Sequence, residues 1–323
     1  MISLEKILRS SSRALVVGVG GGGDVVGALA AARFLEFCGV EFLLGGLSWE
    51  RPEIDPLPGP RSAEEVKHVR VLHRYAWLAN HQSSTETGIL LAESRMAGII
   101  GREVLLVDIN GGVQGVVDGL KAAVHEFRAD LLVGVDVGGD SLARGTELGL
   151  RSPLADSIML AAFATLEGQG VQTLWGVFGY GSDGEMTVEE IERALSEIAG
   201  VGGLLGAWAL TQEVTTELEH VIRFVPTEAS SIPVMCARGA WGQTKIRQGQ
   251  CAVRLTPLAT ITFFLSPTAV LRTLSGPGRA VRQSSSLEEA NEALHAVGLK
   301  TELDLEREQY GETLGSNRSP ECE

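Results

Sequence analysis

Apolar runs alternate with amphipathic stretches along much of the chain. Four times an apolar run leads into a Gly- or Asp-rich loop and then into a pattern with helical periodicity. The runs are Ala14–Val19, Val104–Asp108, Leu131–Val135 and Thr173–Phe178. Runs that are apolar on both faces are typical of parallel strands covered by helices on each side. The alternation therefore predicts a doubly wound, mostly parallel, Rossmann-like α/β fold.

The stretches after these runs predict helices over about 24–37, up to Phe127, from near Asp156, and over about 188–198. The intervening loops follow the carboxyl ends of parallel strands. We therefore expect them to meet at one edge of the sheet, where open α/β folds bind ligands.

Other segments complete the expected domain. Trp49–Arg61 carries four prolines and is expected to be a stiff loop that covers the site. We expect residues 1–225 to form the core, residues 226–309 to complete the same domain, and a disordered tail over 310–323. Further strands are expected at Val40–Leu44, along the alternating stretch Val69–Trp77, at Cys251–Thr256 and at Thr260–Leu265, with a short helix after Ser284–Ser286.

Charge narrows the classes of partner. The formal net charge is −14 and no run of Lys and Arg occurs, which argues against nucleic acid or an anionic membrane as a partner. The stretch after Arg13 is too short for a signal peptide, and Leu258–Leu265 is too short to span a bilayer. We expect a cytoplasmic protein with reduced cysteines. The apolar segment Val201–Leu210 suits either a homodimer surface or burial within the monomer.

The first loop has the form GxGxxG between a strand and a helix. Its glycines permit a tight turn and the close approach of a phosphate to backbone N–H groups, and Gly27 stands where a close helix–strand contact is expected. Asp24, however, would place a carboxylate where a pyrophosphate should sit, and Glu50 comes late for a ribose-binding acid. The candidate cofactor-binding residues are Gly18, Gly20, Gly21, Gly22, Gly23, Asp24 and Glu50.

Carboxylates follow the remaining strands. Asp136 and Asp140 straddle a Gly-Gly turn directly after a buried strand, where they are costly to desolvate unless they bind a cation, a hydroxyl or a backbone donor. Asp183, in the next loop, and Asp108 also follow strands, so they are candidates for the same kind of binding. We assign Asp136, Asp140 and Asp183 as candidate catalytic residues, and Asp136, Asp140 and Asp108 as candidate metal ligands.

Other polar residues in these loops have structural interpretations. We expect Glu147 and Asp156 to be structural, with Asp156 capping a helix. Thr187 and Glu190 have the spacing of a capping box. The histidines show no metal-binding spacing, and neither a P-loop nor a GxSxG motif is present.

Six motifs in order resemble the family catalogued as domain of unknown function 1152, whose members occur in archaea and bacteria. They begin at Val17, Gly45, Asp55, Val135, Ser152 and Phe178, and the similarity extends over about 14–305. The resemblance implies that these loops belong to one site, and it implies no particular reaction.

Three hypotheses follow. The first is an enzyme that acts on a small phosphorylated or nucleotide-like metabolite, with Mg²⁺ held by the carboxylates. The second, ranked below it, is an NAD(P)-dependent oxidoreductase. The third is a non-catalytic ligand sensor or assembly subunit. Fold analogy alone does not separate them.

Overall fold

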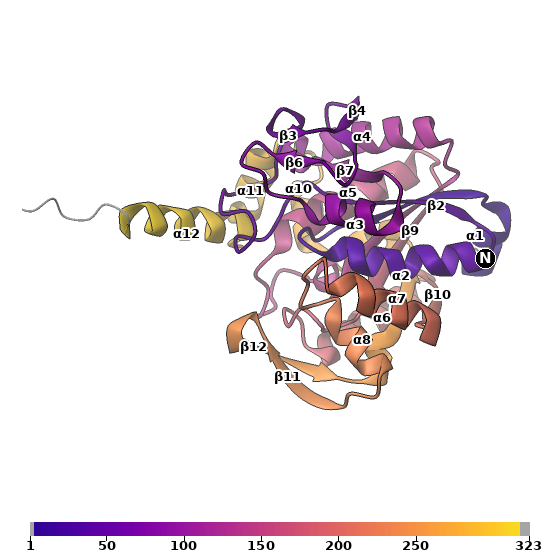
Figure 1. Cartoon of the computed structure of the whole chain (residues 1–323). Helices are drawn as coiled ribbons and strands as arrows, with labels where there is room; N and C mark the ends of the chain where they lie inside the picture. The colour runs from indigo at the N-terminus through magenta and orange to yellow at the C-terminus, as the bar shows by residue number, and fades with distance from the viewer. Residues whose placement is uncertain (1–2, 317–323) are drawn as a thin grey trace, which may run out of the picture.

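The predicted α/β fold is confirmed. The computed structural model describes residues 3–316, and within them nine strands form one central sheet between two layers of helices (Figure 1). The order across the sheet is β10 (Leu204–Ala209), β13 (Ile261–Leu265), β9 (Thr173–Phe178), β8 (Leu131–Val137), β1 (Arg13–Gly18), β2 (Glu41–Leu47), β7 (Val104–Val107), β5 (Ala76–Ala79) and β4 (Arg70–His73).

The five central strands are all parallel. They lie in the order β7-β2-β1-β8-β9, which is 3-2-1-4-5 when the strands are counted along the chain. This is the Rossmann-like order, in which the chain leaves β1 toward one side of the sheet and later returns beside it with β8. The switch point therefore lies between the carboxyl ends of β1 and β8.

Antiparallel strands extend the sheet on both sides. β13 and β10 continue it beyond β9, while β5 and β4 continue it beyond β7. The alternating stretch Val69–Trp77 thus contains the edge strand β4, as predicted, although Trp77 itself lies fully buried in β5. β10, from the segment Val201–Leu210, forms the other edge, and the homodimer stays a prediction.

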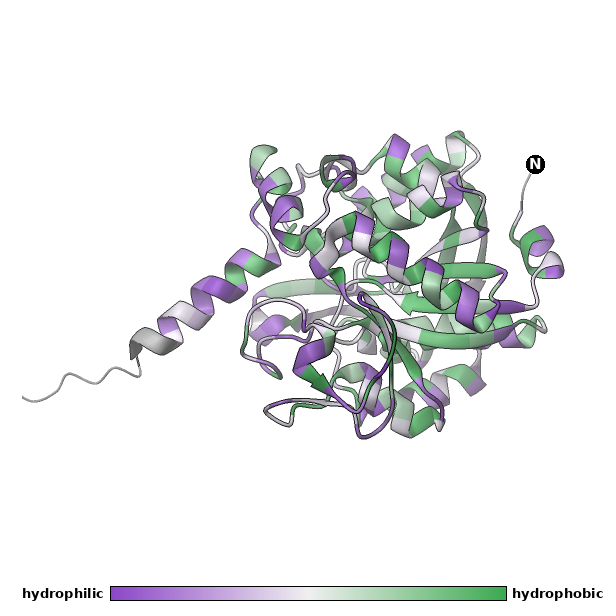
Figure 2. Ribbon diagram, turned by 90° about the horizontal axis from the view of Figure 1, so that it is seen from above, coloured by the Kyte–Doolittle hydropathy of each residue, from purple (hydrophilic) through white to green (hydrophobic). Residues whose placement is uncertain are grey.

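Helices cover both faces of the sheet, and alternate residues of β1 point into different cores: Leu15 and Val17 into one, Ala14 and Val16 into the other. Figure 2 shows the apolar strands between the mixed helical layers. The first core includes α4 (Gly112–Phe127), α5 (Pro153–Gly168), α6 (Val188–Gly200), α9 (Pro267–Thr273), α10 (Gly276–Val281) and α11 (Leu287–Ala296). The second includes α1 (Leu4–Ser10), α2 (Asp24–Phe37), α3 (Ala92–Ile100), α7 (Gln212–Ile222) and part of α8 (Ser231–Ala237).

Two small two-stranded sheets lie outside the central sheet. One pairs β3 (Val66–Lys67) with β6 (Ser84–Thr85), and the other is a hairpin of β11 (Gly242–Ile246) and β12 (Cys251–Leu255). The hairpin carries a side chain into the pocket described below.

The C-terminal segment differs from the expectation. α12 (Glu302–Ser316) continues past Tyr310, where we expected disorder, and projects from the body of the molecule (Figure 1). Residues 317–323 of the expected tail lie outside the described range. Among the helices of residues 3–316, none has both the length and the apolar character needed to cross a membrane.

Candidate functional site

A pocket with an empty volume of about 430 Å³, the solvent at its mouth included, lies at the switch point of the sheet. Its walls come from the loops after β1, β2, β8 and β9, from the first turn of α5, from the segment before α8 and from the β11–β12 hairpin. The polar and glycine residues that line it are Gly20, Gly21, Asp24, Arg51, Asp140, Ser152, Asp156, Asp183, Glu185, Glu228 and Arg247.

The first loop depends on glycine for its close packing. A Cβ on Gly18 would lie 2.4 Å from the backbone carbon of Asp24, and one on Gly27 would lie 2.3 Å from Cγ2 of Val137 in β8. No side chain fits in either place, so the expected close helix–strand contact at Gly27 is confirmed. The first contact holds the N-terminus of α2 against the end of β1, and the second holds the first turn of α2 against β8.

Asp24 occupies the position at which a phosphate would meet this loop. Its Oδ2 accepts hydrogen bonds from the backbone amides of Gly20 at 3.0 Å and Val137 at 3.3 Å. The Gly22 amide donates to the carbonyl of Trp49 at 2.8 Å. Burial, together with the nearby Asp136 carboxylate, raises the pKa of Asp24 to about 7. Two amides of the glycine loop are thus engaged within the protein.

Asp136, at the end of β8, is held by the turn that follows it. Its Oδ1 accepts from the Gly139 amide at 3.0 Å, and its Oδ2 accepts from the amide and the hydroxyl of Ser141. Burial nevertheless raises the pKa of Asp136 to about 6. The Gly138-Gly139 turn, with φ of 129° and 108°, then places Asp140 at the start of the 3₁₀ turn η3 (Asp140–Leu142), where it lines the pocket.

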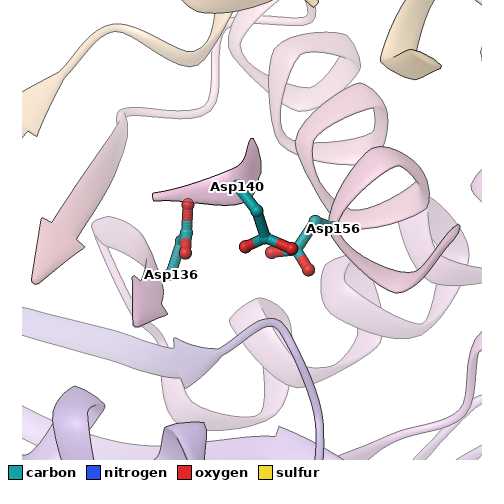
Figure 3. A group of neighbouring side chains, drawn as sticks. All are labelled: Asp136, Asp140 and Asp156. Atoms are coloured by element: carbon teal, nitrogen blue, oxygen red, sulfur yellow. The ribbon is translucent and has the colours of Figure 1, made fainter. Parts of the chain in front are cut away.

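Asp156 joins this pair from the first turns of α5. Figure 3 shows its carboxylate close to that of Asp140, with Asp136 on the other side of Asp140. One oxygen from each of the three carboxylates lies within 4.8 Å of the others. Asp156 is only 3% exposed, and its Oδ1 has no hydrogen-bond partner among residues 3–316. The prediction that Asp156 caps the helix was wrong, because Glu302 accepts the amides of Leu154 and Ala155 instead.

Asp183 and Glu185, from the loop after β9, form a second group with Asp140, again within 4.8 Å. Oδ2 of Asp183 is buried without a partner, and Oδ1 accepts from the Glu185 amide at 3.2 Å. Glu185 is fully engaged. Its oxygens accept from the amides of Arg151 and Ser152, from the Ser152 hydroxyl and from the Arg247 guanidinium.

Burial and mutual repulsion raise the pKa of three of these carboxyls, Asp140, Asp156 and Asp183, well above the ordinary value. The basic side chains that line the pocket are Arg51 and Arg247. Seven carboxylates in or beside the pocket therefore face these two guanidinium groups, an excess of five negative charges when all are ionised. Glu228 is exposed, and the other six are buried: Asp24, Asp136, Asp140, Asp156, Asp183 and Glu185.

Two predicted residues lie elsewhere. Asp108 follows β7, three strands from β8, and its Oδ1 accepts from the Asn110 amide at 2.8 Å to begin the turn η2 (Ile109–Gly111). Glu50 accepts from the Ala92 amide at the start of α3. Neither lines the pocket, because strand order and helix placement, rather than chain order, decide which strand ends meet.

The remaining glycines of the first loop pack against neighbouring segments. A Cβ on Gly22 would meet the side chain of Arg51 at 2.7 Å, and one on Gly23 would meet Thr227 at 2.8 Å. Among the predicted cofactor-binding residues, the loop therefore brings Gly20, Gly21 and Asp24 to the pocket wall.

Two structural interpretations from the sequence are confirmed. Thr187 accepts from the Glu190 amide at 3.2 Å, while Glu190 accepts from the Thr187 amide at 2.7 Å, which completes the capping box. Glu147 accepts from the amides of Arg144, Gly145 and Thr146 and so closes its own loop.

Several pocket residues were not predicted as site residues: Arg51, Asp156, Glu185, Glu228 and Arg247. Asp156 and Glu185 carried a usable signal, because both belong to the motifs that begin at Ser152 and Phe178. Arg247 lies in none of these motifs. It reaches the pocket from the tip of the β11–β12 hairpin, so its position could not be predicted from the sequence.

One protein family matches most of the chain. A family model described as "Protein of unknown function (DUF1152)" matches residues 15–310. No curated protein matches the chain.

Proposed function

The chain belongs to the DUF1152 family, and we propose that it is an enzyme that uses a divalent cation, Mg²⁺ by preference, to act on a small phosphorylated or nucleotide-like metabolite. The proposal rests on one observation above all. Asp156 and Asp183 each carry a buried carboxylate oxygen without a partner, in one pocket that also contains Asp140.

Buried carboxylates that lack donors are costly, and a cation is the partner that relieves this cost. The candidate ligands are all oxygens, which suits Mg²⁺, Mn²⁺ or Ca²⁺ better than metals that favour nitrogen or sulfur. Asp136, Asp140 and Asp156 would hold the ion. Mg²⁺ in that place would polarise a phosphoryl oxygen of the substrate.

The substrate class follows from what else lines the pocket. Arg51 and Arg247 provide guanidinium groups, which recognise phosphate and carboxylate oxygens through paired hydrogen bonds. A phosphate would bind between these guanidinium groups and the cation, whose positive charges would offset part of its repulsion by the carboxylates. The enclosed space is about 50 Å³, so the pocket itself would hold ions and a small anionic group, and the rest of a metabolite would lie in its open mouth.

The two alternatives rank lower. An NAD(P)-dependent oxidoreductase needs a free glycine-loop amide for the pyrophosphate and an acid near the ribose. Here Asp24 engages the Gly20 amide and Glu50 binds the start of α3, which weighs against it. A ligand sensor would bind the same metabolites without turning them over.

Thermal unfolding of the full chain tests the proposal. The protein is screened with Mg²⁺, Mn²⁺ or chelator against nucleotides, nicotinamide cofactors and sugar phosphates, because ligands that bind the native state raise Tm. A shift that needs both the cation and a phosphorylated ligand, followed by turnover of that ligand, is the expected result. A Tm that neither Mg²⁺ nor Mn²⁺ changes, with or without a phosphorylated ligand, would overturn the proposal.

A further inference from the structure

Asp140 belongs to both groups of neighbouring carboxylates. On one side it lies with Asp136 and Asp156, and on the other side with Asp183 and Glu185. A carboxylate has two oxygens, so one such group between two cations can bind both. The arrangement has the form of two adjacent cation positions with a shared ligand.

Each side also has its own unsatisfied atom. Oδ1 of Asp156 and Oδ2 of Asp183 are both buried without a hydrogen-bond partner, and the two side chains are 3% and 6% exposed. Both side chains line the pocket. A single cation among Asp136, Asp140 and Asp156 would leave the Asp183 oxygen unpaired, because Asp183 falls in the other group.

The second position already contains a positive charge from the protein. The guanidinium of Arg247 donates to Oε1 of Glu185 at 2.6 Å. Arg247 and Gln248 both adopt left-handed backbone conformations, with φ of 50° and 56°, which are unfavourable for residues other than glycine. The hairpin tip is thus held in a strained turn while Arg247 contacts Glu185.

The charge of the pocket fits two divalent ions. With Glu228 included, the carboxylates in or beside the pocket exceed the two guanidinium groups by five negative charges when ionised. One divalent cation would offset two of these charges, and two would offset four. A second ion would also release Arg247 from Glu185 and leave its guanidinium free for a substrate anion.

We propose that the pocket binds two divalent cations, one with Asp136 and Asp156 and the other with Asp183 and Glu185, with Asp140 between them, and that Arg247 takes the place of the second cation until it binds. This inference rests on the proposed function, since it assigns a second ion to the same site. Paired divalent ions about 4 Å apart stabilise the attacking and leaving oxygens of a displacement at phosphorus.

Mn²⁺ is the probe for the test. Equilibrium dialysis of the full chain counts the bound ions, and low-temperature electron paramagnetic resonance distinguishes an exchange-coupled pair from isolated ions. We expect two Mn²⁺ per chain with a coupled signal.

Asp183→Asn should bind one ion and lose the coupling. Arg247→Gln should bind the second ion tighter, on the order of tenfold, because a competing charge is removed. Arg254→Gln, an exposed change in the same hairpin, should behave as the unchanged protein.

Three outcomes separate the two proposals. One Mn²⁺ per chain, with the same number in Asp183→Asn, would overturn the second position and leave the proposed function standing. No bound Mn²⁺ in the unchanged protein would overturn both. Two uncoupled ions would contradict the sharing of Asp140. The count and the coupling in the unchanged protein need no variant, so a variant that fails to fold does not affect them.

Discussion

The amide of Gly20 donates to Oδ2 of Asp24 at 3.0 Å, so the glycine-rich loop closes on a carboxylate of its own helix. A dinucleotide pyrophosphate would have to displace that carboxylate or lie against it. We therefore expect NAD(H) and NADP(H) at millimolar concentration to leave Tm unchanged. A rise of about 2 °C or more, in the range produced by about 1 kcal/mol of binding, would restore the oxidoreductase hypothesis.

The Asp156 carboxylate should have opposite effects on the free and cation-bound forms. In Asp156→Asn, a buried like charge is removed, so the metal-free protein should gain about 1 kcal/mol of stability. The rise in Tm on addition of Mg²⁺ or Mn²⁺ should be lost, because a ligand oxygen of the cation has been replaced by an amide. Thermal unfolding with chelator and with each cation measures both effects.

The matched control is Asp118→Asn, which makes the same change on α4, outside the pocket, where Asp118 accepts from Gln114. It should keep the full cation response. An Asp156→Asn protein that still responds to Mg²⁺ like the control would contradict the assignment of Asp156.

The stability of the metal-free protein should fall as pH rises. Burial raises the pKa of Asp136 to about 6 and that of Asp24 to about 7 in the folded chain, above the ordinary value near 4. The folded state therefore binds more protons than the unfolded state between pH 4 and 7, so stability present at pH 4 is lost by about pH 7.

The expected decrease is on the order of a few kcal/mol, seen as a lower denaturant midpoint. Saturating Mg²⁺ should flatten the dependence, because the cation stabilises the ionised carboxylates. A denaturation midpoint that rises between pH 4 and 7 in the presence of chelator would contradict this explanation.

Gly27 should tolerate no side chain. An alanine Cβ there would lie 2.3 Å from Cγ2 of Val137 and 3.0 Å from Cδ1 of Phe178, so Gly27→Ala should cost about 1–3 kcal/mol of unfolding free energy. Val137→Ala in the same chain should recover part of this loss. Gly168→Ala, at the end of α5 with open space around its Cβ, is the control and should be neutral or slightly stabilising. Equal effects at both glycines would refute the steric argument.

The proline-rich loop is held by a buried ion pair. Nε of Arg61 lies 3.1 Å from Oδ2 of Asp55, the two side chains are only 8% and 3% exposed, and the same guanidinium donates to loop carbonyls. Asp55→Asn should cost about 2 kcal/mol, because it leaves the buried guanidinium with a single ion pair, to the half-exposed Glu65 at 3.3 Å. Glu126→Gln, which breaks an exposed pair with Arg70, should cost about 1 kcal/mol or less. Urea denaturation of the two variants compares them directly.

Local order could be predicted from the sequence, because hydrophobic periodicity is a short-range signal. The expected helix over 24–37 and the strand Thr173–Phe178 match α2 and β9 residue for residue. The sequence also predicted that Asp136 and Asp183 lie near Asp140, because parallel strands that are neighbours in the sheet end at the same edge.

The global arrangement could not be predicted in the same way. Nothing in the sequence of β7 indicates that two strands separate it from β8, so Asp108 was grouped with the wrong neighbours. Asp156 was assigned to helix capping because its spacing from Pro153 suits that role, whereas Glu302 supplies the acceptor from a distant helix. Contacts of long sequence separation depend on packing, which a single sequence does not report.

The first turns of α12 connect two walls of the pocket that are far apart in the chain. Glu302 accepts the amides at the start of α5, and Glu306 accepts from the indole of Trp49 and the amide of Gly59 in the proline-rich loop. During synthesis on the ribosome, all five parallel strands emerge well before these two glutamates. The sheet can therefore form while the pocket is still incomplete, and a nascent chain reaches its binding-competent form only when α12 docks.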